Sequence, residues 1–186
     1  MNANLKGSQF LIAKKFIEEK FGPEAFDKIL EQLPDPDKTL LCRHLYSINM
    51  YPEQTLINLI IALDKIFGKG DYKLCEEIGA YGAEVGTAKI FKVFIHFGDP
   101  LFVLSRSPIF WKRIHDHGSI KVTSVKNNTA TLQIQDYKTP HQSFCMLTIG
   151  YFKAILKMSG AKNIELFETK CVTKGANCCE FSAAWD

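Results

Sequence analysis

The hydrophobic pattern of this chain first changes its period at Gly118. Before Gly118 the apolar residues recur every three or four positions, as at Phe10, Ala13 and Ile17, and this spacing places them on one face of a helix. After Gly118 apolar and polar residues alternate, which is the pattern of a half-buried strand. Helices followed by strands predict an α+β fold, in which a helical N-terminal half packs on an antiparallel sheet.

The first part of the chain, residues 1–117, is predicted to be mainly helical. Segment 53–67 is apolar on most sides and predicts a well-buried helix, while 38–47 predicts a shorter one. A long helix is expected over 72–97, with Asp71 as its N-cap. Two short helical segments follow before the period changes.

The long helix is expected to pack closely against another element, because it contains three glycines. Gly79, Gly82 and Gly86 lie within it, and glycine costs a helix about 1 kcal/mol relative to alanine. The compensation that we expect is the close approach of another helix or of a ligand.

The remaining part, residues 118–186, predicts the order strand, strand, helix, strand, strand. The first two strands form a hairpin that turns at Asn127 and Asn128. Apolar residues at helical spacing predict a helix over 143–158, and two further strands complete an antiparallel sheet of about four strands. The chain contains no internal repeat, low-complexity tract or linker, so a single domain over 1–186 is predicted.

The composition is that of an ordinary soluble domain, with 46% hydrophobic and 23% charged residues. The 14 phenylalanines predict an aromatic interior or an apolar cavity. The net charge of +3 is spread along the chain, so we expect no nucleic acid as partner. There is no apolar leader and no apolar run long enough to span a bilayer. Six cysteines without a secretion signal favour reduced thiols or metal binding, and we expect a cytoplasmic protein.

The C-terminal hairpin carries the strongest candidate site. Glu168 and Cys171 lie on its first arm and Cys179 on its second, and Cys145 stands at the start of the helix upstream. Three thiolates and one carboxylate suit the tetrahedral coordination of Zn²⁺, and four protein ligands leave no open position, so such a zinc would be structural. The alternative is that these cysteines are small buried hydrophobic residues. Cys178 is adjacent to Cys179, and only one of the two can face the ion, since side chains alternate along a strand.

The same hairpin carries a family resemblance. Glu-x-x-Cys, seven residues, Cys and an apolar strand resemble the end of the 4-vinyl reductase domain family and of zinc-bearing members of the related haem nitric oxide/oxygen-binding (H-NOX) family. By that resemblance Cys145, Glu168, Cys171 and Cys179 are the metal ligands, with Cys179 favoured over Cys178 by spacing. Segment 7–33 also resembles the start of H-NOX domains. Both families are thought to share one ligand-binding fold with an apolar cavity, which a vesicle-tethering subunit also uses.

The resemblance implies a ligand pocket built from aromatic residues. In the phenol-sensing branch of the family a His near the position of His96 binds the ligand hydroxyl, and one buried polar group in an aromatic wall fixes a ligand's orientation. The alternative is that His96 only caps its helix. Wall residues are expected to be Phe94, Phe102, Phe110 and Trp111, each of which is otherwise a core residue. A hydrophobic or aromatic small molecule is the expected ligand.

A second set of residues bears on whether the chain binds haem. His115, Asp116 and His117 could bind a metal or haem, and the alternative is a solvated helix end rich in polar groups. H-NOX domains hold haem through a His in this segment before the hairpin. They also clamp the haem propionates with Tyr-x-Ser-x-Arg. The comparable place here contains Tyr137, Thr139 and His141, so the arginine whose fork suits a carboxylate is replaced. On this departure the sequence predicts that haem is not bound in the H-NOX manner.

No nucleophile elbow, phosphate-binding loop or dinucleotide fingerprint is present, so catalysis is not predicted. The main hypothesis is a non-enzymatic small-molecule sensor or carrier with an apolar cavity and a structural zinc. It would act as a homodimer through its helical face and signal through a separate partner protein. The two alternatives are a haem-based gas sensor of the H-NOX type and a scaffold like the vesicle tether.

Overall fold

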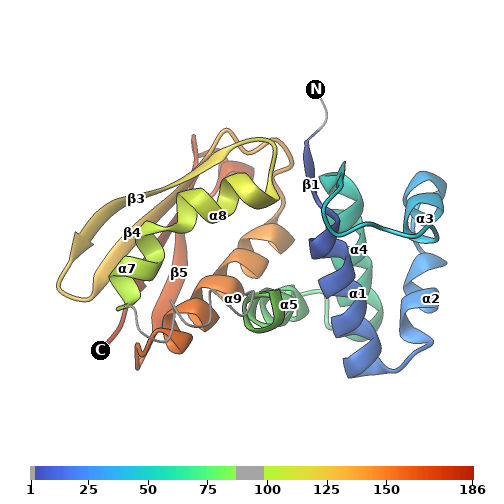
Figure 1. Ribbon diagram of the computed structural model, residues 1–186, viewed down its shortest axis with the longest axis horizontal. Helices are drawn as coiled ribbons and strands as arrows, with labels where there is room; N and C mark the ends of the chain where they lie inside the picture. Colours follow the sequence, from blue (N-terminus) through green and yellow to red (C-terminus); the bar gives the residue numbers. More distant parts are fainter. Residues whose placement is uncertain (1–2, 87–98) are drawn as a thin grey trace.

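The computed structural model describes residues 3–86 and 99–186, and these residues form a helical half and a half built on a sheet. Figure 1 shows the helices of the first half on one side, the sheet on the other, and two helices, α5 and α9, between them. The α+β fold predicted from the change of period is therefore confirmed. The predicted ligand residues Phe94 and His96, and the end of the predicted helix 72–97, lie outside the described residues.

The N-terminal half is helical except for two short strands. Its elements are β1 (Asn4–Lys6), α1 (Gly7–Phe21), α2 (Ala25–Leu30), α3 (Asp35–Leu41), β2 (Met50–Pro52), α4 (Glu53–Phe67) and α5 (Lys73–Gly86). The apolar helix α4 is buried along most of its length, as its composition predicts. The predicted helix over 38–47 is wrong in its bounds, because α3 starts earlier and ends at Leu41. The antiparallel pair of β1 and β2 was not predicted, since three residues are too few to show a period.

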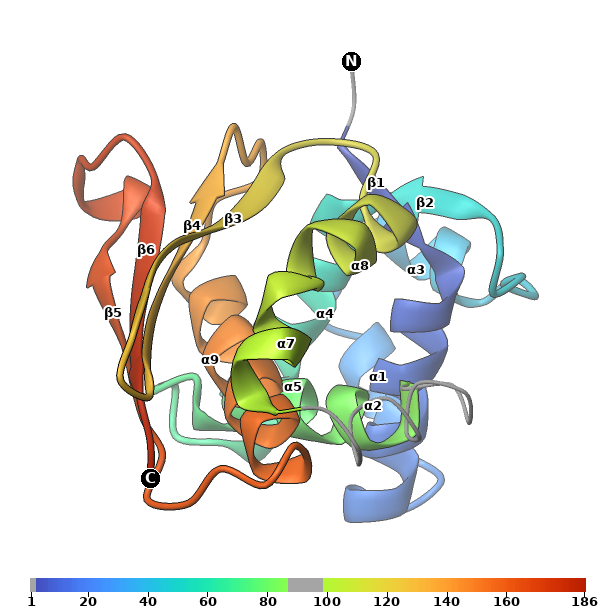
Figure 2. The same ribbon diagram turned by 60° about the vertical axis from the view of Figure 1, so that its left-hand side comes forward.

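The C-terminal half follows the predicted order, preceded by two short helices. Its elements are α7 (Pro100–Ser105), α8 (Ser107–Ile114), β3 (Ser119–Lys126), β4 (Thr129–Gln135), α9 (Gln142–Met158), β5 (Glu165–Lys170), the 3₁₀ turn η1 (Val172–Lys174) and β6 (Cys179–Ala184). The four strands pair antiparallel in the order β3-β4-β6-β5. Leu132, Ile134 and Phe181 are buried on the face that meets the helices, and alternate residues face outward. Figure 2 shows α7 and α8 crossing in front of α9.

Helices α5 and α9 cross with their backbones in direct contact. A Cβ added to Gly79 of α5 would lie 1.9 Å from the carbonyl oxygen of Leu147, and one added to Gly150 of α9 would lie 1.8 Å from the carbonyl oxygen of Glu76. Any side chain at either position would therefore collide with the opposite helix. The close approach predicted for the glycines of this helix is thus real at Gly79 and is made by another helix.

The β3–β4 hairpin turns through two residues in the left-handed region, Asn127 at φ 43° and Asn128 at φ 59°. We expect Asn128→Ala to destabilise the protein by roughly 1–2 kcal/mol, because alanine has no local hydrogen bond to offset the steric cost of this conformation. Urea denaturation would measure the change. Asn128→Gly is the control and should cost little, since glycine adopts positive φ freely. Equal losses in both variants would contradict this explanation.

Candidate functional site

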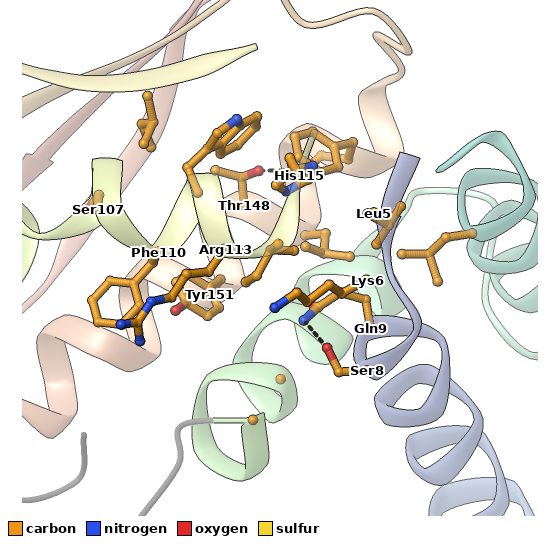
Figure 3. A pocket seen from close by; sticks show the side chains of 18 of the residues that line it. Leu5, Lys6, Ser8, Gln9, Ser107, Phe110, Arg113, His115, Thr148 and Tyr151 are labelled. Carbon is orange, nitrogen blue, oxygen red and sulfur yellow. Dashed lines mark hydrogen bonds between the residues drawn. The ribbon is translucent and has the colours of Figure 1, made fainter. Parts of the chain in front are cut away.

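A largely apolar cavity of about 300 Å³ lies where the two halves meet. Its walls come from β1, α4, α5, α8 and α9, and Figure 3 shows the lining side chains. The apolar lining includes Leu5, Leu56, Ile57, Phe144, Phe152 and Ile155. A concave apolar space with few polar groups is the usual form of a small-molecule site, although this volume is at the lower end of the range of about 300–1,000 Å³.

Of the wall residues predicted from the sequence and described by the structure, two line the cavity and one does not. Phe110 and Trp111 of α8 line the cavity. Phe102 of α7 does not line it: the ring is 40% exposed and lies under the guanidinium of Arg106, 4.8 Å from it. Because α7 and α8 are separate short helices, their aromatic residues do not share one face.

Polar groups reach the cavity at a few points only. Figure 3 shows Lys6 from β1 and Arg113 from α8 extending into the same space. Tyr151 of α9 also lines it, and burial raises the pKa of its phenol to about 12. This phenol therefore stays protonated at neutral pH and is able to donate a hydrogen bond. His115 is the single imidazole among the described lining residues.

His115 belongs to a buried cluster that the sequence analysis did not assemble. Its Nδ1 lies 2.9 Å from Oε1 of Glu53, and Nε2 of His117 lies 3.0 Å from Oε2 of the same carboxylate. The side chain of Glu53 is 1% exposed and that of His117 is 2% exposed. Glu53 is the first residue of α4, where an acidic side chain is ordinarily explained by the helix dipole alone, so its sequence gave no sign of these partners.

Neighbouring groups hold the cluster in place. Nδ1 of His117 lies 3.2 Å from the carboxylate of Asp116, which accepts two hydrogen bonds of 2.8 Å from Asn4. Partial burial opposes ionisation of Asp116, but the hydrogen bonds from Asn4 and the contact with His117 together lower the pKa of this carboxyl below its usual value. The hydroxyl of Thr139 donates to Oε2 of Glu53.

Tyr137, Thr139 and His141, which occupy the place of the H-NOX propionate clamp, make other contacts in this structure. The ring of Tyr137 stacks on Phe144 with 4.3 Å between centroids. Nδ1 of His141 accepts a hydrogen bond of 3.1 Å from the backbone of Ser143 and so caps α9. Neither Tyr137, Thr139 nor His141 lines the cavity.

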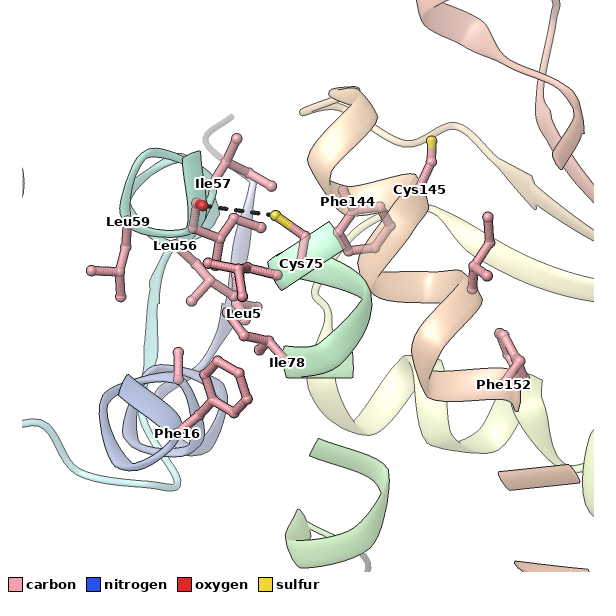
Figure 4. Packing of buried hydrophobic residues seen from close by; sticks show 14 of the residues in the cluster. Leu5, Phe16, Leu56, Ile57, Leu59, Cys75, Ile78, Phe144, Cys145 and Phe152 are labelled. Carbon is pink, nitrogen blue, oxygen red and sulfur yellow. Dashed lines mark hydrogen bonds between the residues drawn. The ribbon is translucent and has the colours of Figure 1, made fainter. Parts of the chain in front are cut away.

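The four predicted metal ligands meet on the other side of α9. One atom from each of Cys145, Glu168, Cys171 and Cys179 lies within 4.8 Å of the others, and Cys145 Sγ is 3.9 Å from both Cys171 Sγ and Cys179 Sγ. Figure 4 shows Cys145 projecting from α9 away from the side on which Phe144 packs. The assignment of these side chains as ligands of an ion remains a prediction.

The thiols of this group are not equivalent. Cys179 accepts a hydrogen bond from the Cys145 thiol, which lowers the pKa of Cys179 to about 6 and raises that of Cys145. The hydrogen bond therefore favours Cys179 over Cys145 as the thiolate of this pair. Cys178 is only partly buried and lies outside the group; it precedes β6, which begins at Cys179.

Comparison with known proteins relates the chain to H-NOX structures. No protein-family model and no curated protein matches the sequence. An H-NOX protein from Shewanella oneidensis in the Fe(II) state superposes with a TM-score of 0.77 at 16% identity, over 97% of this chain and 96% of that one. The Fe(II) unliganded H-NOX protein from K. algicida gives 0.74 at 16% identity, over 97% and 96%. The chain therefore has the H-NOX fold, and that part of the predicted resemblance is confirmed, whereas the link to 4-vinyl reductase domains is not shown.

These comparisons correct the expectation about the cofactor. The sequence analysis predicted a structural zinc and no haem. The structural neighbours are instead H-NOX proteins in Fe(II), Fe(II)NO and Fe(II)CO ligation states, and another of them was studied for heme distortion. The zinc-centred prediction is wrong because it weighed one local motif above the fold that surrounds the cavity.

None of the described helices is long and apolar enough to cross a membrane.

Proposed function

We propose that this chain is a non-enzymatic sensor domain of the H-NOX type that takes haem into the cavity between its two halves. The observation that carries the proposal is the position of this cavity. It is enclosed by α4, α5, α8 and α9 in a fold shared over almost its whole length with proteins described in Fe(II) and Fe(II)NO states. Bound haem would supply the iron to which a gas molecule binds.

The lining residues offer the groups that such a ligand needs. His115 would be the axial ligand, since it is the one imidazole of the described lining. The cationic side chains of Lys6 and Arg113 line the same cavity and would neutralise the propionates in place of the altered Tyr137–His141 segment. The protonated phenol of Tyr151 would donate a hydrogen bond to a polar gas ligand.

A second candidate is a small aromatic molecule in place of haem. It is favoured by the volume of about 300 Å³ and by the fact that Tyr137, Thr139 and His141 do not line the cavity. In that case Tyr151 and His115 would orient the ligand by hydrogen bonds. The homodimer and the separate signalling partner, which were predicted from the sequence, remain part of this proposal.

Addition of haemin to purified protein tests the first candidate. We expect a Soret band that saturates at one haem per chain and shifts when nitric oxide is added to the reduced protein. His115→Ala should abolish or shift this band, because the axial imidazole is lost. Phe102→Ala is the matched control, since Phe102 does not line the cavity. Absence of a Soret band, together with an organic molecule released on denaturation, would favour the second candidate.

A further inference from the structure

We propose that Glu53, His115 and His117 form a binding site for one divalent transition-metal ion at the junction of the two halves. The three residues come from the start of α4, the end of α8 and the connection to β3. Their ligand atoms lie within 4.8 Å of one another, and the carboxylate oxygens are 2.9 Å and 3.0 Å from the two ring nitrogens. The site is independent of the thiol group and does not depend on haem.

The first argument is that three of the converging atoms are buried without a hydrogen bond. Oε1 of Glu53, Nδ1 of His115 and Nε2 of His117 are shielded from solvent, yet none of them makes a hydrogen bond in the part of the chain that the structure describes. The short distances therefore do not correspond to N–H groups directed at the carboxylate. Buried polar atoms that are left unpaired are costly, and an ion between them would satisfy all three at once.

The second argument is the outer contact of His117. Its Nδ1 lies 3.2 Å from the carboxylate of Asp116, which accepts a hydrogen bond when it is ionised, so this nitrogen faces an outer acceptor. Nε2 points the other way, toward Glu53 at 3.0 Å, and makes no hydrogen bond to it. An ion at this place would bind both Nε2 and the Glu53 carboxylate. A carboxylate behind a histidine is also the usual outer partner of a metal-ligating imidazole.

The third argument is the chemistry and spacing of the donor set. Two imidazoles and one carboxylate suit iron, cobalt, nickel or zinc-group divalent ions better than magnesium or calcium, which prefer oxygen alone. Ligand bonds of about 2.0–2.2 Å place neighbouring ligand atoms about 3 Å apart, which is close to the spacing found here. Three protein ligands leave at least one position open for water or for a molecule in the adjacent cavity.

The surroundings fix the two rings before any ion binds. Trp111 stacks on His115 with 4.0 Å between ring centroids and donates its indole N–H to the carbonyl of His117 at 2.8 Å. Asn4 holds Asp116 through two hydrogen bonds, and the Thr139 hydroxyl binds Glu53. Stacking holds His115, and hydrogen bonds or carboxylate contacts hold Glu53 and His117, so an ion would bind without rearranging the fold.

The inference has a consequence for the proposed function. An ion on Nδ1 of His115 leaves the ring proton on Nε2, so the same imidazole cannot also bind haem iron. The ion and haem are therefore expected to compete for His115. His117 does not line the cavity, so it would bind the ion but not haem. A change at His117 therefore distinguishes the ion proposal from the haem proposal.

Titration of haem-free protein with Co²⁺ tests the site, because the visible spectrum of this ion reports its ligands. Apart from any ion on the thiol group, we expect one equivalent bound without a thiolate-to-metal charge-transfer band, and loss of that equivalent in His117→Ala and in Glu53→Gln. His141→Ala is the matched control and should retain it. Asp116→Asn keeps all three ligands and should weaken binding about 10- to 100-fold. Circular dichroism checks that each variant is folded.

The outcomes separate this inference from the proposed function. His117→Ala that binds Co²⁺ as the wild type does, or wild-type protein whose bound Co²⁺ always shows thiolate ligation, would overturn the inference. If His117→Ala does not fold, Asp116→Asn decides the question by itself. A Soret band retained in His117→Ala supports the haem proposal whatever the Co²⁺ result, and a colourless protein that binds Co²⁺ at this site supports the ion alone.

Discussion

Gly150→Ala is expected to destabilise the protein by about 3 kcal/mol or more, at the upper end of the cost of overpacking a core. The added Cβ would lie 1.8 Å from the carbonyl oxygen of Glu76, which is backbone and cannot rotate away. Relief would require α5 and α9 to move apart along the line where the helical half and the sheet half meet. Guanidinium denaturation at neutral pH would measure the loss.

Gly82→Ala provides the matched control on the same helix pair. A Cβ at Gly82 would have its nearest neighbour, Cγ2 of Ile12, at 3.7 Å, which is ordinary contact. Because alanine favours the helix over glycine, this variant should be unchanged or more stable by up to about 1 kcal/mol. A Gly150→Ala protein as stable as the wild type would show that the two helices are not in the contact described.

If Cys145, Glu168, Cys171 and Cys179 bind an ion, Cys171→Ser is expected to remove it and to lower the free energy of unfolding by on the order of 4 kcal/mol. The reason is that Cys171, on the turn between β5 and β6, lies among the side chains of Cys145, Glu168 and Cys179, all from other positions of the chain. An ion on this group would tie the C-terminal hairpin to α9. Elemental analysis of the purified protein, with denaturation before and after chelation, would measure both effects.

Cys178→Ser is the control for this prediction. Cys178 is adjacent to Cys179 in the sequence but is partly exposed and outside the group, so its replacement should leave metal content and stability unchanged. Wild-type protein that contains no metal and keeps its stability in chelator would contradict the assignment of these four residues. They would then be buried thiols that contribute only through packing.

The sequence by itself determined most of the elements and their order. The period of the apolar residues predicted the helices and the strands on either side of Gly118, and the Asn127–Asn128 pair predicted the first hairpin. These features follow from interactions between residues close together in the chain, which a local pattern records. The grouping of Cys145 with the C-terminal hairpin was also expected, although there a family resemblance supplied the pairing that spacing left open.

The tertiary structure alone decided which distant groups meet and where the cavity lies. Glu53 reads as an ordinary helix-start residue until the fold places it 2.9 Å from His115 and 3.0 Å from His117, more than sixty residues away. The zinc-centred prediction failed for the same reason. It used residues of the C-terminal hairpin and α9, and these residues carry no information about the cavity between the two halves. Contacts between distant segments depend on how whole elements pack, and the periodicity of each element fixes only which face it buries, not the partner that covers that face.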